Sequence, residues 1–162
     1  MSADKLRAIK NYHRISGDLA TAGQPTPGQL ADIAEAGYEA LINIDSATAV
    51  PNEDALVTSK GLGYFHIPVV WTEPKQSDLH LFFDLMDALK GKRVFVHCAA
   101  NARVSTFVYL YRISRLGVDP VEGEKDLHEL WEPNEIWSTF IDEAAGRLGL
   151  ELSRRNRGRE DR

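Results

Sequence analysis

Short apolar strands alternate with amphipathic helices along this 162-residue chain, and that alternation constrains the fold more than any other feature. Runs at 41–44, 64–70 and 93–97 have the length and apolar character of strands. Helical patterns lie between them, at about 51–60 and 77–90. Strand–helix alternation predicts an α/β fold with a mostly parallel central sheet of four to five strands and helices on both faces.

Capping residues mark where the helices begin and end. Thr26 and Gln29 form a predicted capping box with Pro27 at the first helical position, and Gly37 is placed to end that helix in a left-handed conformation. Two further extended segments are expected at 12–15 and 18–22. Three more helices are expected: one at 103–116 that Gly117 stops, one that begins at a second capping box at 119–122 and runs towards Trp131, and one at about 134–148. The last helix is expected to bury Ile136, Trp137, Phe140, Ile141 and Ala144.

The length and composition of the chain predict one globular domain that spans residues 1–150. A hydrophobic fraction of 43% and a charged fraction of 27% are ordinary for such a domain. The net charge of −5 argues against a nucleic-acid partner. Residues 151–162 differ, with five arginines and three acidic residues, and we expect a basic, flexible tail.

A single cysteine excludes an intramolecular disulfide. The polar N-terminus carries no apolar signal region and no stretch is apolar enough to span a bilayer, so we expect a cytoplasmic protein with a reduced thiol and no membrane partner. The histidines outside the cysteine segment show no ligand spacing. The sequence therefore predicts no metal and no cofactor.

The cysteine lies where a strand enters a short loop of small residues that leads directly into a helix. The segment runs Val94-Phe95-Val96-His97-Cys98-Ala99-Ala100-Asn101-Ala102-Arg103-Val104-Ser105. Successive loop amides and a helix N-terminus can converge on an oxyanion. The same field stabilises a thiolate, so we expect the pKa of Cys98 to fall below ~8.5. In parallel sheets the ligand site lies beyond the carboxyl ends of the strands, which is where this loop would be.

This segment resembles the signature loop of the protein tyrosine phosphatase superfamily, which reads His-Cys, five residues, Arg, then Ser or Thr. The order of elements is similar to the compact dual-specificity branch and its bacterial relatives. The stretches Gly23-Gln24-Pro25, Ile42-Asn43-Ile44 and Gly63-Tyr64-Phe65-His66-Ile67-Pro68 add to the likeness. The resemblance covers about residues 10–115.

The arginine differs from that pattern by one position. Counting from Cys98, the family's arginine would be residue 104, which is Val104 here, and Arg103 stands one place earlier. One residue near a helix start is about 100° of rotation, so Arg103 is expected to point away from a phosphate unless the loop is reshaped. Asn101 replaces the family's usual glycine, and asparagine tolerates positive φ.

The resemblance implies a role for each loop residue. Cys98 is the nucleophile that forms a phosphocysteine, and Arg103 clamps two phosphate oxygens. His97 orients the loop and lowers the thiol pKa, and the Ser105 hydroxyl hydrogen-bonds the Cys98 sulfur. The phosphate-binding set that the resemblance implies is Cys98, Ala99, Ala100, Asn101, Ala102, Arg103 and Val104.

A general acid is also required to protonate the leaving oxygen. The family uses an aspartate in the loop after the preceding strand. Residues 68–77 contain no aspartate, and Glu73 is the one carboxylate before the helix. Glu73 is therefore the predicted acid.

Three functions remain open. The first is a phosphomonoester phosphatase, for phosphotyrosine or mixed substrates, whose partners would be a phosphorylated protein or a small phosphomonoester and whose loop would hold phosphate or a similar oxyanion. The second is a weakly active or inactive phosphate- or phosphopeptide-binding module, favoured by the displaced arginine and the missing aspartate. The third is a sulfurtransferase, which also places cysteine on an anion loop; Asn101, His97 and Ser105 fit it less well.

Overall fold

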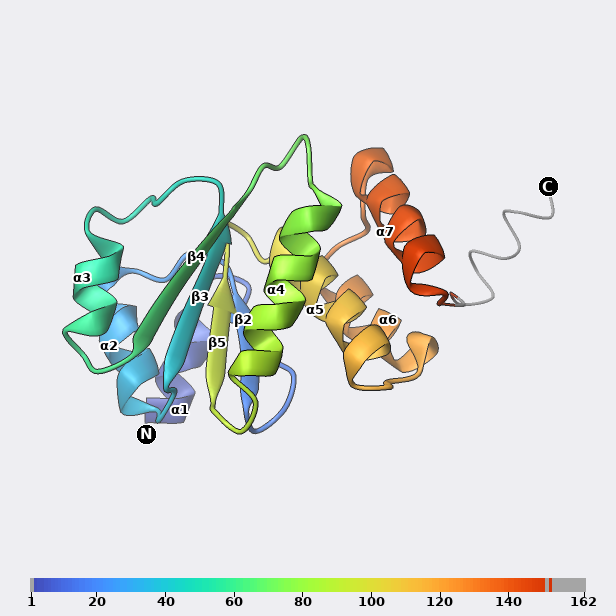
Figure 1. Ribbon diagram of the computed structural model, residues 1–162. Helices are drawn as coiled ribbons and strands as arrows, with labels where there is room; N and C mark the ends of the chain where they lie inside the picture. Colours follow the sequence, from blue (N-terminus) through green and yellow to red (C-terminus); the bar gives the residue numbers. More distant parts are fainter. Residues whose placement is uncertain (1, 151, 153–162) are drawn as a thin grey trace.

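The computed structural model describes residues 2–150 and 152, and a five-stranded sheet forms its centre. The strands are β1 (His13–Arg14), β2 (Leu19–Ala22), β3 (Ala40–Asp45), β4 (Gly63–Val69) and β5 (Val94–His97). Their order in the sheet is β1-β2-β5-β3-β4 (Figure 1). β1 pairs antiparallel with β2, and the other pairings are parallel. The predicted mostly parallel α/β sheet is confirmed.

Helices connect the strands and extend the chain beyond the sheet. They are α1 (Ser2–Lys5), a 3₁₀ turn η1 (Leu6–Ala8), α2 (Pro27–Glu35), α3 (Glu53–Thr58), α4 (Gln76–Ala88), α5 (Ala102–Arg115), α6 (Pro120–Leu130) and α7 (Glu135–Leu148). None of the described helices is both long and apolar enough to cross a membrane. Of the predicted basic tail, all but Leu152 lies outside the described residues.

Two hydrophobic cores lie on opposite faces of the sheet. One joins α4, α5 and α7 to the sheet, and the other joins η1, α2 and α3 to it. Side chains alternate between the two faces along each strand, so that in β5 Val94 and Val96 enter the first core and Phe95 the second. His97 has the parity of Phe95 and therefore faces α3, a placement that matters below.

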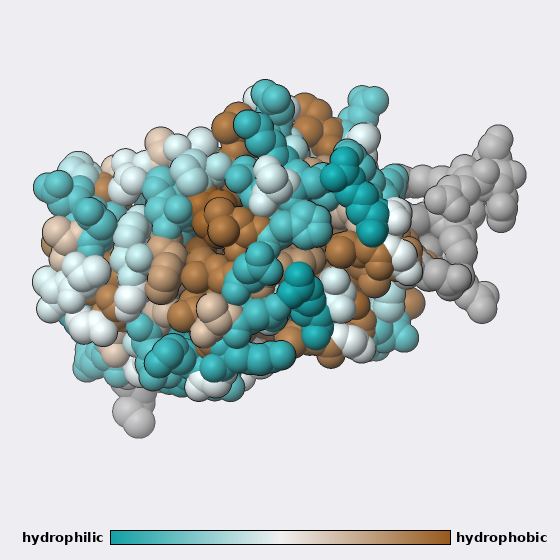
Figure 2. Space-filling model, viewed as in Figure 1, coloured by the Kyte–Doolittle hydropathy of each residue, from teal (hydrophilic) through white to brown (hydrophobic). Residues whose placement is uncertain are grey.

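The surface is polar over much of the face seen in Figure 1, with a hydrophobic area over the sheet between α3 and α4 (Figure 2). β4 is the edge strand on this side. Its Pro68 has no N–H to donate, which suits an edge position. The register of β3 and β4 shifts between Asn43 and Asp45, so that Asp45 comes to lie beside Val69. This irregularity brings the Asp45 carboxylate and the Val69 carbonyl, both hydrogen-bond acceptors, close together at the end of the sheet.

Two local predictions were wrong in detail. Ile136 was expected to be buried but is 45% exposed. It lies on the solvent side of α7, whereas Trp137, Phe140 and Ile141 lie on the side that packs in the core. Asp119 does cap α6 by accepting from the amide of Val121, but Glu122 does not complete a box. It pairs with Lys125 instead. The capping box of Thr26 and Gln29 is confirmed in both halves.

Candidate active site

Cys98 follows β5 directly, at the carboxyl end of a strand that lies between β2 and β3. Residues 98–101 connect that strand to α5. Cys98 is only 1% exposed, so its sulfur lies below the surface and an oxyanion would have to approach it from the loop side. The strand–loop–helix arrangement predicted for this segment is confirmed.

The carbonyls of loop residues 98–100 are held by hydrogen bonds from other parts of the protein. The bonds are Gln24 N to Ala99 O at 3.0 Å, Asn11 Nδ2 to Ala100 O at 2.9 Å, and His97 Nδ1 to Cys98 O at 3.1 Å. Three successive carbonyls are therefore occupied by donors of the surrounding protein. A peptide group whose carbonyl is tied on one side presents its N–H on the other, which is the arrangement an anion loop needs.

The first turn of α5 keeps free amides. Asn101 is the N-cap residue with φ 69°, and its side chain makes no capping bond. In the described part of the chain, no protein acceptor meets the amides of Ala102, Arg103 or Val104. Uncapped helix N-termini carry partial positive charge and bind anions. The expectation that Asn101 tolerates positive φ is confirmed.

Asn101 fixes the loop to the β1–β2 hairpin. Its Nδ2 donates to Asn11 O at 2.8 Å and to Thr21 Oγ1 at 2.9 Å, and the residue is fully buried. A glycine would allow the same backbone conformation but would lose both bonds. Asn101 therefore supplies both the left-handed turn and the attachment of the loop.

Arg103 is turned towards the carboxyl ends of β3 and β4. It is 6% exposed, and its guanidinium donates to Val69 O at 2.8 Å and to Asp45 Oδ1 at 3.1 Å. Because Asn43 lies opposite His97 in the sheet, Asp45 and Cys98 are at the same end of neighbouring strands. The one-residue displacement therefore does not send Arg103 to the outer surface of the helix.

Trp71 covers this end of the sheet. The guanidinium of Arg103 lies 5.9 Å from the centre of its ring, within the range of a cation–π contact. The Trp71 ring also packs at a tilt against Trp131 and Trp137, at 5.4 Å and 5.6 Å between ring centres, and its carbonyl accepts from the Trp137 indole. The C-terminal helices thus support the loop that lies above Arg103.

Ser105 has a different partner from the one expected. Its hydroxyl donates to Ala102 O at 3.0 Å, one turn back in the same helix, a bond typical of serine within helices. The side chain lines a small cavity with Thr21 and Tyr109, on the α6 side of α5. The predicted bond from Ser105 to the Cys98 sulfur is therefore replaced by a bond to Ala102. Val104 is fully buried in the core, so only its amide is available to an anion.

Glu73 is exposed, and among the described residues the carboxylate paired with Arg103 is that of Asp45 rather than that of Glu73. Glu73 lines a shallow depression between the β4–α4 loop and α7, together with Glu135 and Glu143. Among the described residues, the contacts of Arg103 come from Val69, Asp45 and Trp71. The structure thus does not bring the predicted acid to the arginine, and Asp45 is the carboxylate that it does bring.

Glu53 is the buried acid that sequence reasoning missed. It begins α3, is fully buried, and its Oε2 lies 3.1 Å from Nε2 of the equally buried His97. Tyr64 donates to Oε2 and Gln24 Nε2 donates to Oε1, both at 2.7 Å. Acidic residues are common in the first turn of a helix because they interact favourably with the helix dipole. Nothing in the sequence therefore indicates that Glu53 is more than such a residue.

The environment of Glu53 favours its charged form. Burial alone would raise its pKa, but the hydrogen bond and charge of His97, with the bonds from Gln24 and Tyr64, hold that pKa below its ordinary 4.5. The pKa of Tyr64 is raised, by burial first and also by its bond to the Glu53 carboxylate. Asn43 Nδ2 donates to the Tyr64 hydroxyl at 3.2 Å and completes the network.

Stability should therefore depend on pH through Glu53. Since its folded pKa lies below 4.5, its contribution is complete above pH 4.5 and is lost as pH falls through the folded value. Glu53→Gln should cost about 3 kcal/mol at pH 7, the effect of breaking a buried pair. The difference from wild type should shrink below pH 4.5. Urea unfolding at pH 7, 5.5, 4 and 3 measures it, and a pH-independent difference would contradict this.

A second group of polar side chains lies where β1 and α5 meet α6. His13 Nε2 lies 2.7 Å from Asp126 Oδ1 and its Nδ1 lies 3.8 Å from Glu129, a grouping that could hold a metal by distance. Arg112 also lies 2.7 Å from Asp126 and competes for that carboxylate. The burial of Asp126 raises its pKa, but the bonds from His13 and Arg112 outweigh it and the pKa is lowered. The group ties α5 and α6 to β1.

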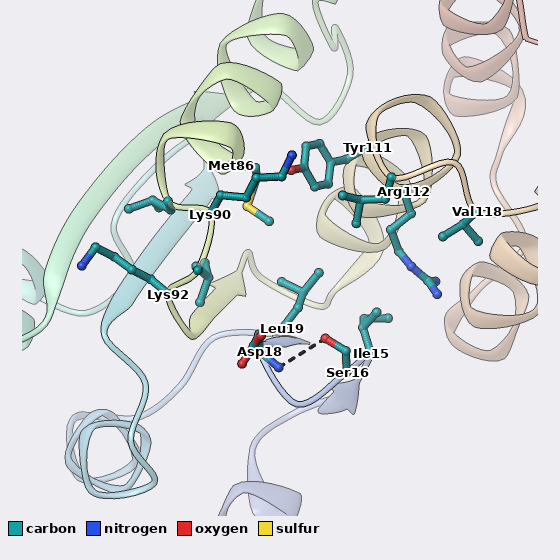
Figure 3. Close-up of a pocket in the computed structure, with 14 residues that line it drawn as sticks. Ile15, Ser16, Asp18, Leu19, Met86, Lys90, Lys92, Tyr111, Arg112 and Val118 are labelled. Carbon is teal, nitrogen blue, oxygen red and sulfur yellow. Dashed lines mark hydrogen bonds between the residues drawn. The ribbon is translucent and has the colours of Figure 1, made fainter.

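A pocket of about 350 Å³ lies at the other end of the sheet (Figure 3). Leu19 and Val94, paired at the beginnings of β2 and β5, form its floor, and Met86 and Tyr111 line its wall. Figure 3 shows that Lys90 extends across it towards Tyr111. The pocket is separated from Cys98 by the length of β5, so it is not part of this site.

Comparison with known proteins places the chain in a family, although no protein-family model matches it. A "beta-lactamase hydrolase-like protein" of Xylella fastidiosa is 30% identical over 125 residues, which are 70% of this chain and 28% of that protein. The chain thus spans little more than a quarter of the length of the curated relatives it matches.

Solved structures match over nearly the whole chain. A "putative phosphatase (DUF442)" from Shewanella putrefaciens CN-32 has a TM-score of 0.80 and 32% identity, covering 90% of this chain and 97% of that one. P. aeruginosa TpbA, in complex with pTyr, has a TM-score of 0.67 and 15% identity, with coverages of 86% and 90%; at that identity the likeness shows the fold alone. With these matches and the Cys98 loop in its expected place, the chain belongs to the DUF442 family, and it shares its fold with Tk-PTP and TpbA.

Proposed function

We propose that this protein is a cysteine-dependent phosphomonoester phosphatase that acts through a phosphocysteine at Cys98. The observation that carries the proposal is the loop after β5, whose carbonyls are tied outward while the first amides of α5 have no protein acceptor. The DUF442 relative supports phosphatase chemistry. The proposed substrates are phosphotyrosine or mixed phosphoproteins, a choice supported by the pTyr bound to TpbA.

The proposed reaction has two displacements. The Cys98 thiolate attacks phosphorus, the bond from phosphorus to the leaving oxygen breaks, and a general acid protonates that oxygen. Water then attacks the phosphocysteine, the sulfur–phosphorus bond breaks, and inorganic phosphate leaves while the thiolate is restored. The loop amides stabilise the charge on the phosphoryl oxygens in both steps.

Arg103 can join the phosphate without leaving its present partners. A guanidinium has five N–H donors, and two are engaged here by Val69 and Asp45. The remaining donors are available for a bidentate contact with phosphate oxygens. Asp45 and the Val69 carbonyl would then fix the direction of the fork rather than compete with the substrate.

Two carboxylates are candidates for the general acid, and substrates with different leaving groups can distinguish between them. Glu73 is the acid that the sequence predicted, and Asp45 is the one beside Arg103. Loss of the acid should slow alkyl phosphates about 10²-fold while aryl phosphates with good leaving groups change little. We expect this selective loss for Glu73→Gln, since Asp45 is engaged by the guanidinium of Arg103 whereas Glu73 is exposed to a leaving group.

Turnover of alkyl and aryl phosphates by Glu73→Gln and Asp45→Asn measures the effect. An equal loss on both substrates would remove Glu73 as the acid. A selective loss in Asp45→Asn alone would transfer the role to Asp45.

The second candidate is a phosphate-binding module without turnover. It is favoured by the burial of Cys98 and by the engagement of Arg103 with Asp45. Hydrolysis of an aryl phosphate and binding of vanadate distinguish the two. Vanadate binding without hydrolysis would select the module, and hydrolysis that is lost in Cys98→Ser would select the phosphatase.

A further inference from the structure

The hydrogen bonds of His97 determine how many protons it carries. Nδ1 lies 3.1 Å from the carbonyl oxygen of Cys98, which can only accept. Nε2 lies 3.1 Å from Oε2 of Glu53. Glu53 accepts from Tyr64 and Gln24, and these bonds together with His97 hold its pKa below the ordinary value, so its ionised carboxylate is the acceptor towards Nε2. Both ring nitrogens of His97 thus face oxygen acceptors, which is the geometry that a doubly protonated ring requires.

A fully buried imidazolium needs a fixed counter-charge. Burying a lone charge is strongly unfavourable, so a neutral ring would be preferred if Glu53 carried no charge. Glu53 is also fully buried, and its pKa is lowered by the surrounding donors. A positive charge on His97 would lie on the ring that contacts the backbone of Cys98.

The same carboxylate holds the next residue of the loop. Gln24 donates from its side chain to Glu53 Oε1 and from its backbone N–H to Ala99 O. Through His97 and Gln24, Glu53 is thus connected to two successive loop carbonyls, those of Cys98 and Ala99. Removing the charge would loosen both connections.

We propose that Glu53 is a positioning residue for Cys98: its carboxylate keeps His97 doubly protonated, and the buried imidazolium aligns the loop and stabilises the thiolate. This role of Glu53 in catalysis rests on the proposed function, in which Cys98 is the nucleophile. Other charged or titratable groups near the network are Tyr64 and Asp54 on the Glu53 side and the Arg103–Asp45 pair at the mouth of the loop.

The single cysteine gives a direct test. Alkylation by iodoacetamide can report only on Cys98, because the chain has no other thiol. Glu53→Gln keeps the shape, since its amide can donate to His97 Nε2 and accept from Gln24, but it removes the charge. We expect the midpoint of the curve of alkylation rate against pH to rise by about one unit, with about tenfold less thiolate below it.

Tyr64→Phe is the matched control. It removes one hydrogen bond to the same carboxylate and leaves the charge, so its midpoint should stay close to that of wild type. Circular dichroism and thermal melting verify that both variants are folded. Equal midpoints in wild type and Glu53→Gln would overturn the proposal, as would an equal rise in Tyr64→Phe.

A spectroscopic measurement covers the case in which Glu53→Gln does not fold. In ¹⁵N-labelled wild type, the assigned His97 nitrogens should both carry protons at neutral pH, and a neutral tautomer would overturn the proposal. Neither readout needs turnover. A shifted midpoint in a protein that hydrolyses no phosphate would defeat the proposed function alone, and activity with no shift would defeat this inference alone.

Discussion

Replacing Cys98 with serine is expected to lower kcat/KM for p-nitrophenyl phosphate by about 10³-fold or more. A serine hydroxyl at neutral pH is a far weaker nucleophile than a thiolate, while the backbone of the loop stays as it is. Steady-state hydrolysis at pH 6–7 measures the change.

The control for this substitution is anion binding. Because the carbonyls of the loop are tied by Gln24 and Asn11, and not by the thiol, Cys98→Ser should still bind inorganic phosphate. Isothermal calorimetry checks this on the same sample. Turnover by Cys98→Ser close to that of wild type would exclude chemistry at this cysteine, whatever the phosphate affinity.

The second large effect is expected at Arg103. Arg103→Ala should weaken vanadate inhibition and lower kcat/KM by about 10²- to 10³-fold, because a preorganised donor to the phosphoryl oxygens is lost. Arg103→Lys should recover only part of this, since lysine supplies charge without the planar fork. An unchanged vanadate inhibition constant in Arg103→Ala would refute the clamp role.

A double variant separates this binding effect from stability. The side chains of Arg103 and Asp45 are only 8% and 13% exposed, so Arg103→Ala leaves a mostly buried carboxylate unpaired, at a cost of about 3 kcal/mol. Adding Asp45→Asn should restore much of the unfolding free energy but none of the vanadate affinity. Urea unfolding and inhibition constants measured together test this. Recovery of both properties would mean that Arg103 acts only on folding.

Much of the fold could be predicted because its signals are local. Short apolar runs indicated the strands at 41–44, 64–70 and 93–97, and Thr26, Pro27 and Gln29 set the start of α2. Asn101 was expected to tolerate positive φ, and it does so at the start of α5. Ile136 was misplaced because helical spacing alone does not say which side of α7 meets the core.

The candidate site was only partly predictable. Cys98 and its loop follow from a strand, small residues and a helix, all within twelve residues of sequence. Ser105 was assigned to the sulfur by the family pattern, but its hydroxyl bonds to Ala102 within its own helix. That the displaced Arg103 points away from a phosphate stays a prediction. The structure adds its partners, Asp45 and Val69, which the register shift between β3 and β4 brings together.

By itself, then, the sequence determined the α/β class, the order of elements and the cysteine loop, because periodicity, caps and turn residues act over a few positions. Only the tertiary structure decided that Arg103 meets Asp45, 58 residues away, and that His97 meets Glu53, 44 residues away. Those partners depend on how neighbouring strands are aligned and on which face each side chain takes. No local pattern encodes that alignment, because it is fixed by packing of the whole sheet against its helices.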